Sequence, residues 1–488
     1  MTRQQRLALT AAILGSSVVT LDSSVISVAL PAIERDLGGG LAAQQWISNG
    51  YLLTLGSFIL IGGALGDLYG EHRVFLTGVL AFGVFSLLCA VAPNVEVLIA
   101  ARALQGISGA VLAPASLAVI VNAFVPDERS AAIGTWTALG AIAAIVGPLI
   151  GGWVVDALSW RWIFALNVPP VVATVALAAV AIPRADQAEL RSVDLLGAGL
   201  CASALVAIVL ALIEEPRHGW SPVIIGLLVF GGVAFAAFVR RERIISAPML
   251  KLALFACRNF SAGNGQTLLV YGGMNVLFFF LMLYLQEVVG YTPLQSGLAA
   301  APTTIVVFLL ARRFGVMADR RGPRRLLIAG PAISTVGILL LTRVGLHPNY
   351  VTDLLPGLLV FAVGLATMVA PMTAIVLADA DDSDAGGASA INNSIAKLSG
   401  LIGISAVGMA IAGTLGRGGG FTPDMASVHA FHHAALICGS LVAAGGVVGA
   451  LAVVDPPRAL HARGCSAGQL AGVPKRAAGC PLTQDTPA

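Results

Sequence analysis

Long apolar stretches recur along nearly the whole chain, and only short polar segments separate them. Each stretch has about 18 or more residues, which is enough to cross a hydrocarbon core of about 30 Å as a helix. The first stretch runs to about Leu30, which is too long for a cleaved signal peptide. The pattern predicts an all-α integral membrane protein with fourteen spans, at about residues 7–31, 46–66, 74–93, 97–120, 131–154, 162–182, 195–213, 221–239, 263–286, 296–317, 326–343, 354–376, 387–412 and 431–453.

Composition and charge placement support these spans. The chain is 57% hydrophobic and 11% charged, whereas a soluble domain has about 25% charged residues. An even number of spans places both termini on one side of the membrane. Of the 28 Lys and Arg residues, 21 then fall on the side of the termini, five fall on the other side, and Arg102 and Lys397 lie within spans. Because cytoplasmic loops carry the excess of basic residues, we expect both termini to be cytoplasmic.

The chain also repeats itself. Gly, Asp, Gly and Arg recur at one offset of 252 residues in the loops after the second and tenth spans, as Gly63, Asp67, Gly70 and Arg73 and as Gly315, Asp319, Gly322 and Arg325. Matching loops in two membrane halves are typical of a duplicated transporter. We therefore expect a six-helix bundle at 1–182, two inserted helices at 183–245 and a second six-helix bundle at 246–455. The Pro- and Gly-rich segment 456–488 is expected to be a disordered cytoplasmic tail.

Several motifs, in order along residues 5–455, resemble those of one family. They are Leu21–Pro31, Gly63–Arg73, Arg102–Gly106, Gly147–Gly152, Trp160–Phe164, Asn167–Pro169 and Tyr284–Gln286. Together they resemble the fourteen-span drug:proton antiporter branch of the major facilitator superfamily, the EmrB/QacA type. The resemblance implies the major-facilitator fold and a proton-coupled antiporter that exports drugs or other small amphipathic molecules by alternating access. One departure is that Leu68, Glu71 and His72 stand where the family usually has basic residues, which weakens the first loop's charge network.

Asp22 is the only one of the 25 carboxylates deep inside a predicted span. It lies about 15 residues into the first helix, or roughly 22 Å at 1.5 Å per residue. An ionised carboxylate at that depth is costly unless it is paired or hydrated. An Asp that alternates between wet and dry surroundings can therefore bind and release a proton, as the resemblance also implies. The alternative is a packing role, with Asp22 bonded to Ser23 or Ser24.

Arg102 is the natural partner of Asp22, because both are expected toward the outer ends of their spans. We predict that the two residues separate and pair again as the proton comes and goes. The alternative is that Arg102 extends outward to water or binds backbone carbonyl groups.

The repeated loops and the fifth span predict moving parts rather than binding sites. Asp67 can pair across helix ends, and Gly63 and Gly70 permit close approach and a tight turn, which together would form a cytoplasmic gate. The alternative is merely a tight loop. Gly147, Pro148, Gly151 and Gly152 match the antiporter motif and permit close helix packing with a kink. A Gly-xxx-Gly pair alone commonly means packing only.

A substrate cavity is expected between the two halves, near the middle of the membrane. Amide and aromatic side chains suit amphipathic ligands, and the candidates are Asn49, Tyr51, Asn264, Gln266, Tyr271, Asn275 and Gln286. Lys397 either extends toward the cytoplasm or is a cavity cation that discourages cationic substrates or contacts anionic ones.

Other function classes lack their motifs. No lysine follows a glycine, so the chain has no Walker A loop, and we expect neither an ATP-driven pump nor an enzyme. No histidine lies deep in a span and no CxxC pair occurs, so we expect no metal and no cofactor, with a proton gradient as the energy source. The expected partners are a small-molecule substrate, protons and the lipid bilayer, without nucleic acid. Arg outnumbers Lys 25 to 3, which favours a GC-rich genome. We expect a monomer in a bacterial cell membrane. The alternatives are a dedicated metabolite or antibiotic transporter and a non-transporting membrane sensor.

Overall fold

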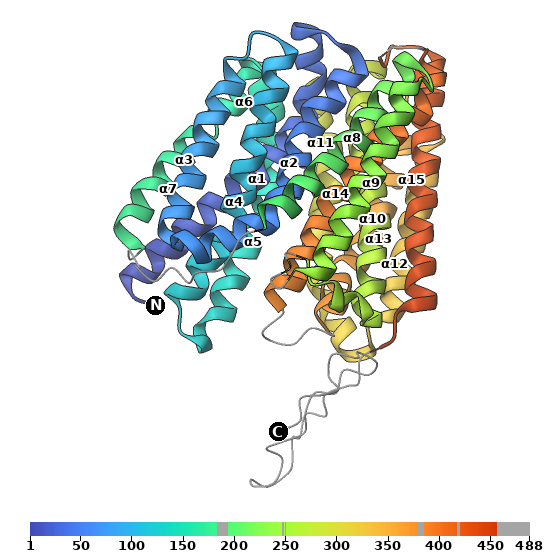
Figure 1. The fold of residues 1–488 in the computed structure, drawn as a ribbon. Coiled ribbons are helices and arrows are strands. Elements are labelled where there is room, and N and C mark those ends of the chain that lie inside the picture. Colours follow the sequence, from blue (N-terminus) through green and yellow to red (C-terminus); the bar gives the residue numbers. More distant parts are fainter. Residues whose placement is uncertain (183–193, 246–247, 249, 379–384, 417–419, 456–488) are drawn as a thin grey trace.

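The computed structural model of the chain describes residues 1–488 except 183–193, 246–247, 249, 379–384, 417–419 and 456–488. The described residues form a bundle of long helices and no strand (Figure 1). The first helices are α1 Arg3–Leu37, α2 Gly40–Tyr69, α3 Glu71–Ala90, α4 Val95–Ala123, α5 Pro126–Ala157, α6 Arg161–Ala165, α7 Val168–Ala181, α8 Leu195–His218 and α9 Pro222–Ile244. They are followed by η1 Leu252–Ala256, α10 Arg258–Leu283, η2 Tyr284–Val288, α11 Pro293–Arg321, α12 Arg324–Leu341, η3 Tyr350–Leu354, α13 Leu355–Ala378, α14 Ala385–Leu415 and α15 Met425–Ala452. The predicted tail at 456–488 lies outside the described residues.

Twelve helical segments in the described part of the chain are long and apolar enough to cross a membrane. Three of these segments join two elements end to end, namely α6 with α7, α10 with η2, and η3 with α13. Besides these twelve, α2 has 30 residues and α5 has 32, more than the ~20 that a span requires. The predicted class of all-α membrane protein is therefore confirmed, while the total of fourteen spans stays a prediction.

The repeated loops adopt the same backbone conformation. Gly70 ends α2 with φ 84°, and its N–H donates to the carbonyl of Gly66 at 3.0 Å. Gly322 ends α11 with φ 88°, and its N–H donates to the carbonyl of Ala318 at 2.8 Å. A positive φ is accessible to glycine at little cost and strains other residues. The 252-residue repeat in sequence is thus also a repeat in local structure.

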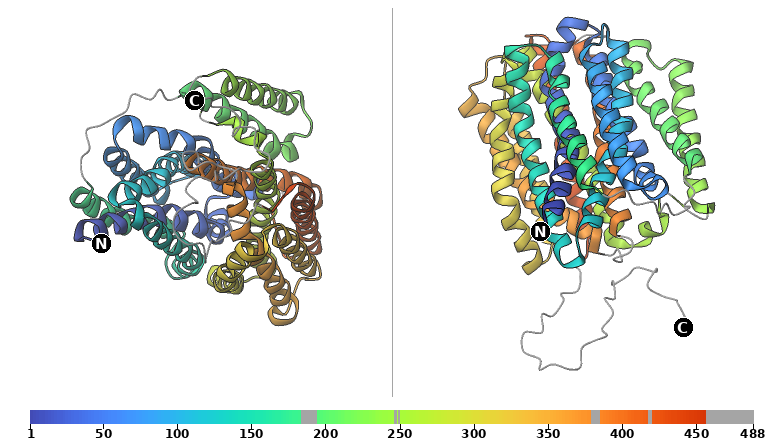
Figure 2. Two further views of the ribbon diagram at one scale, coloured as in Figure 1. Left: turned by 90° about the horizontal axis from the view of Figure 1, so that it is seen from below. Right: turned by 90° about the vertical axis from the view of Figure 1, so that its left-hand side faces the viewer.

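The bundle consists of two sets of helices and a peripheral pair. We call α1–α7 the N-terminal set and α10–α15 the C-terminal set. The two sets meet chiefly where α5 packs on α11 and where α2 packs on α14. The pair α8–α9 lies at the edge of the bundle, and α8 packs against α2 and α14, so it touches both sets (Figure 2).

The pair α8–α9 is fastened by a buried carboxylate at its end. Asp194 caps α8 by accepting the N–H of Gly197 at 2.9 Å, and it also accepts Nε of Arg241 on α9 at 2.8 and 2.9 Å. The Arg241 guanidinium holds the pKa of the Asp194 carboxyl below its usual range.

The hydrogen bonds described between the two sets lie toward one end of the bundle. We call this end of the bundle the distal end. The opposite end, which carries the N-terminus of α1, is called the terminal end (Figure 1). Three buried amide side chains make such bonds: Gln45 Nε2 donates to the Ile404 carbonyl at 2.8 Å, Asn49 Nδ2 to Ser405 Oγ at 2.9 Å, and Gln286 Nε2 to the Val28 carbonyl at 2.9 Å. The N–H of Leu294 on α11 adds a bond to Asp156 of α5 at 3.1 Å. The sets are therefore joined at the distal end.

Candidate functional site

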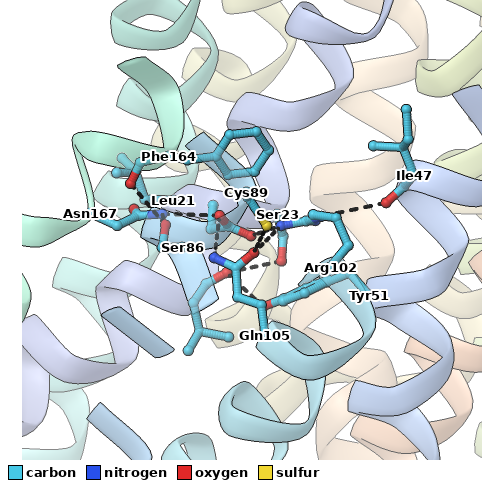
Figure 3. A network of polar contacts seen from close by, with 12 residues as sticks. Leu21, Ser23, Ile47, Tyr51, Ser86, Cys89, Arg102, Gln105, Phe164 and Asn167 are labelled. Atoms are coloured by element: carbon cyan, nitrogen blue, oxygen red, sulfur yellow. Dashed lines mark hydrogen bonds and ion pairs between the residues drawn. The ribbon is translucent and has the colours of Figure 1, made fainter. Parts of the chain in front are cut away.

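Asp22 on α1 and Arg102 on α4 form a buried ion pair inside the N-terminal set. Figure 3 labels Arg102 and the residues that surround the pair. Arg102 Nη1 lies 2.5 Å from Asp22 Oδ2, and the two residues are 0% and 5% exposed. Removing one member of a buried ion pair costs about 3–5 kcal/mol, because the other charge is left without compensation. The predicted partnership of these two residues is therefore a contact in the structure.

Arg102 is held from several directions. Its Nη1 also donates to Gln105 Oε1 at 2.7 Å, and its Nε donates to the Ile47 carbonyl at 3.4 Å. The guanidinium carbon lies 4.2 Å from the centre of the Tyr51 ring, a cation–π contact. Arg102 thus points inward and does not extend to water, although it does bind a backbone carbonyl as one alternative anticipated.

The Asp22 carboxylate accepts two further hydrogen bonds. Gln105 Nε2 and Asn167 Nδ2 both donate to its Oδ1, at 2.9 and 3.0 Å. The hydroxyls of Ser23 and Ser24 instead donate to carbonyls of α1 itself. With Arg102, three donors surround Asp22 and none of them is a serine of its own helix. All three contacts are hydrogen bonds that the carboxylate oxygens accept.

Asn167 reaches this site because the sixth span is interrupted between α6 and α7. Pro169 and Pro170 follow it, and neither can donate a backbone hydrogen bond to the preceding turn. Besides Asp22, Asn167 Nδ2 donates to Ser86 Oγ at 3.0 Å, and Ser86 donates to the Phe164 carbonyl at 2.8 Å. The Asn167 Oδ1 atom is buried without a hydrogen-bond partner among the described residues.

The sequence did not single out Gln105, Asn167 or Ser86 as site residues. Gln105 stands three positions after Arg102, so one face of α4 carries both. The Pro169–Pro170 pair marks the interruption at which Asn167 reaches the site. Ser86 carries no sequence signal of this kind.

The glycine motif of α5 lies directly beside the site. A side chain at Gly147 would overlap Ser24 Oγ, and one at Gly151 would come within 2.5 Å of Val25. On the other side of α5, a Cβ at Gly152 would lie 2.7 Å from the Cα of Leu294 on α11, and the Pro148 carbonyl faces Gly297 of the same helix. The motif therefore packs α5 against α1, next to Asp22, and against the C-terminal set.

The loop motifs correspond only in part to the predicted gate. Gly70 and Gly322 make the tight turns, as expected. Gly63 does not permit the close approach that we predicted, because a Cβ there would touch Pro114 at an ordinary 3.9 Å. The close approach occurs one residue earlier, at Gly62, where a Cβ would overlap the Ala110 carbonyl.

The remaining gate residues lie at the surface or outside what is described. Gly315 is in ordinary contact with Ala370, and the side chains of Arg73, Asp319 and Arg325 are exposed. The side chain of Asp67 lies outside the described part. Asp455 was not predicted here: its carboxylate accepts the N–H of Arg324 at 3.0 Å, beside Gly322. The gating role stays a prediction.

The cavity candidates divide into three groups. Asn49 and Gln286 join the two sets, as described above, and Tyr51 lies beneath Arg102. Gln266 and Asn264 bond within the C-terminal set, to the carbonyls of Leu327 at 2.7 Å and Phe260 at 2.9 Å.

Tyr271 and Asn275 form the third group of candidates. With Met274 and Phe278 they make a partly exposed stripe on α10, a helix that is otherwise largely buried. Lys397 on α14 is also partly exposed. In the described part of the chain, no group of three or more His, Cys, Asp or Glu could hold a metal ion.

Comparisons with known proteins agree in family and fold. The family profile described as Major Facilitator Superfamily matches residues 12–404 and 265–468. A puromycin resistance protein of Streptomyces alboniger is 36% identical over 404 residues, covering 80% of this chain and 78% of that protein. A probable actinorhodin transporter of Streptomyces coelicolor is 32% identical over 83% of this chain and 72% of its own length. A cephamycin export protein of Amycolatopsis lactamdurans is 32% identical over 91% of this chain and 92% of its own length.

Solved structures match at the level of the fold. A bacterial homologue of the human lysosomal transporter Spinster, in an inward-facing conformation, superposes with a TM-score of 0.66 at 16% identity, over 93% of this chain and 97% of that one. A D-xylose–proton symporter gives a TM-score of 0.63 at 15% identity, over 92% of this chain and 98% of that one.

Proposed function

The chain belongs to the Major Facilitator Superfamily, and from this premise we propose that it exports drugs or antibiotics from the cell in exchange for protons. Like the members of its family and its relatives, it is a membrane transporter and not an enzyme. The relatives named for puromycin resistance, actinorhodin transport and cephamycin export support export of antibiotic-like molecules.

The observation that carries the proposal is the Asp22–Arg102 pair. It is a carboxylate inside a membrane-spanning helix, hydrogen-bonded by one cation and two amide donors. Such a residue is expensive in a membrane and is characteristic of proton relays. A structural ion pair would need no coupling to solvent, so the discriminating property is whether Asp22 takes up a proton during transport.

Protonation of Asp22 would remove the charge that binds Arg102, and its new O–H would require an acceptor. Asn167 Oδ1 is buried and without a partner in the described structure. It becomes that acceptor if the side-chain amide rotates so that Oδ1 and Nδ2 exchange positions. The change would reach the rest of the molecule through α5, because Gly147 and Gly151 lie against Ser24 and Val25 and Gly152 lies against α11. Proton binding and the contact between the two sets would thereby be linked.

We further propose alternating access in which residues 1–182 and 246–455 rock as units, with 183–245 at their edge. The distal hydrogen bonds of Gln45, Asn49 and Gln286 would break when the distal end opens. The loops Gly63–Arg73 and Gly315–Arg325 would then close the terminal end. The distribution of basic residues supports a terminal end in the cytoplasm of a bacterium, and the chain works as a monomer. The cargo would pass along the stripe that contains Tyr271 and Asn275.

The test is transport by purified protein in vesicles with an imposed pH gradient. Puromycin and a panel of dyes are offered, and a pH-sensitive fluorophore in the lumen reports proton movement. We expect cargo to enter acidic vesicles while protons leave, and we expect Asp22→Asn to abolish both. Cargo movement without proton movement would exclude antiport, and no movement of any probe would count against export.

A further inference from the structure

Lys397 lies near the middle of a membrane helix. It is 12 residues from the start of α14 at Ala385 and 18 residues from its end at Leu415, or about 18 and 27 Å along the axis. A lysine stem of four carbons does not reach either end over such distances. The ammonium group therefore resides within the bundle, and the possibility that it extends to the cytoplasmic surface is disfavoured.

The neighbours of α14 show which way Lys397 faces. One side of the helix contacts α2 of the N-terminal set, through Leu398 beside Gly56 and Ser405 beside Asn49. Another side contacts α10, and its residues are Asn392, Ser399 and Gly400. Lys397 borders the α2 side, because a Cβ at Gly56 would lie 3.9 Å from the Lys397 Cβ, and Asn393 lies about 40° further round, toward the α10 side.

Leu401 and Ile402 pack in the cluster formed with α8, which marks the outer side of α14. Asn393 is turned about 180° from Ile402, and Lys397 lies beside α2, where a helix of one set meets a helix of the other.

Among the side chains that the structure describes, no carboxylate is paired with Lys397. The sequences of α10, α13, α14 and α15 contain neither Asp nor Glu, and Asp22 is engaged by Arg102. No hydrogen bond or ion pair joins Lys397 to the residues that the structure describes. An uncompensated cation deep in a membrane protein costs a few kcal/mol or more, so a partner from outside the chain would lower its free energy.

We propose that Lys397 binds an acidic group of the cargo, such as a carboxylate, and that the transporter selects anionic molecules. This inference rests on the proposed export function and specifies its substrate class. Asn393 lies one turn before Lys397 and is exposed, and Asn275 of α10 lies against Gly400 one turn after it. Both amides can donate hydrogen bonds to the same anion beside the ammonium group.

The test separates binding from transport. Purified protein in detergent is titrated with a fluorescent aryl carboxylate and with its uncharged primary amide, which have the same shape. Lys397→Met removes the charge and retains a long stem, and Lys397→Arg retains the charge. Lys251→Met is the matched control, because it removes a lysine charge outside the membrane-spanning helices.

We expect Lys397→Met to weaken carboxylate binding by at least about tenfold, the typical effect of losing a hydrogen bond to a charged group. Amide binding should change by less than about twofold, which also shows that the variant is folded. Lys397→Arg and Lys251→Met should retain the wild-type preference. Unchanged carboxylate binding in Lys397→Met, equal losses for both dyes, or a wild-type protein that does not prefer the carboxylate overturns the inference.

The same two dyes are then followed in vesicles with a pH gradient. Proton-driven transport that shows no preference for charge contradicts the anion site and leaves export standing. A charge preference in binding without any proton-driven transport contradicts the proposed export and leaves the anion site standing.

Discussion

The two helix sets share one scaffold but differ in the chemistry of their interiors. The N-terminal set encloses the Asp22–Arg102 pair with its amide donors. At the offset of the loop repeat, the position of Asp22 corresponds to Met274 on α10. In place of an ion pair, the described interior of the C-terminal set contains aromatic contacts, such as Tyr284 stacked on Phe431 with ring centres 4.5 Å apart.

This difference indicates which features a duplicated fold must keep. The turns at Gly70 and Gly322 are the same in both sets because the backbone path requires them. The interior side chains are not bound by that requirement, and a buried ion pair is costly to build. We infer that one set handles the proton, while the other is free to provide cargo contacts such as Lys397.

The sharpest test of this division is to substitute the equivalent positions in the two sets. Asp22→Asn should reduce proton-driven transport to the level of empty vesicles, because an amide cannot release a proton at physiological pH. Cargo binding in detergent should persist. Met274→Leu, at the corresponding position, exchanges one apolar side chain for another of similar volume, so proton movement should stay coupled to cargo movement; Met274 belongs to the proposed cargo stripe, and only the cargo affinity is expected to change. Equal losses in the two variants would contradict the division.

Because the two sets share one scaffold, substitutions of glycines at close helix contacts should lower the stability of the protein by similar amounts in both sets. A Cβ at Gly62 would overlap the Ala110 carbonyl in the N-terminal set, and one at Gly364 would overlap Ser334 in the C-terminal set. Gly62→Ala and Gly364→Ala should each destabilise the protein by about 1–3 kcal/mol, the usual cost of overpacking. Thermal unfolding in detergent measures the loss. Gly134→Ala is the control, because nothing lies within 4 Å of its added Cβ, and it should unfold like the wild type.

Membrane charges are the part of the site that the sequence could predict. A carboxylate within an apolar span stands out because lipid makes it expensive, so Asp22 and Arg102 were found without any structure. Gln105 and Asn167 were not assigned to the site, since an amide is tolerated on many helix faces and its sequence position does not reveal its partner.

The same ambiguity explains the cavity candidates. Asn49 and Gln286 are polar residues in spans, yet their amides join the two sets. Whether a polar side chain faces a cavity or a neighbouring helix depends on rotation about the helix axis, which composition does not specify. The shift from Gly63 to Gly62 has the same origin, because a change of one residue turns the helix face by about 100°.

The amide donors of Asp22 provide a test at the level of single hydrogen bonds. Asn167→Leu removes a donor to the carboxylate and should slow proton-driven transport by roughly tenfold, since a hydrogen bond to a charged group contributes about 1.5–3 kcal/mol. The half-saturating cargo concentration should stay unchanged, because Asn167 is not part of the proposed cargo path. Asn264→Leu removes a buried asparagine from the C-terminal set; a comparable slowing there would show that burial alone, rather than contact with Asp22, causes the effect.

The smallest expected effect separates contacts between the sets from contacts within one. Gln286 and Gln266 are buried glutamines on the same continuous helix, and each donates to a backbone carbonyl. Gln286 reaches Val28 in the other set, whereas Gln266 reaches Leu327 in its own. Gln286→Leu should therefore shift the equilibrium toward an open distal end by about 1 kcal/mol, or roughly fivefold, the net contribution of one hydrogen bond. Gln266→Leu breaks a similar bond within one set, and that bond is present whether the distal end is closed or open. It should therefore lower the stability of the protein without shifting the equilibrium between the closed and open distal end.

Distances between spin labels report that equilibrium directly. Leu158 and Val351 are 60% and 64% exposed and lie near the distal end, one in each set, so Leu158→Cys and Val351→Cys can carry the labels in a background without other reactive cysteines. A longer distance should gain population in Gln286→Leu and stay at its original level in Gln266→Leu. If both variants shift alike, the distal amides stabilise helices in general, and the rocking of one set against the other does not depend on them.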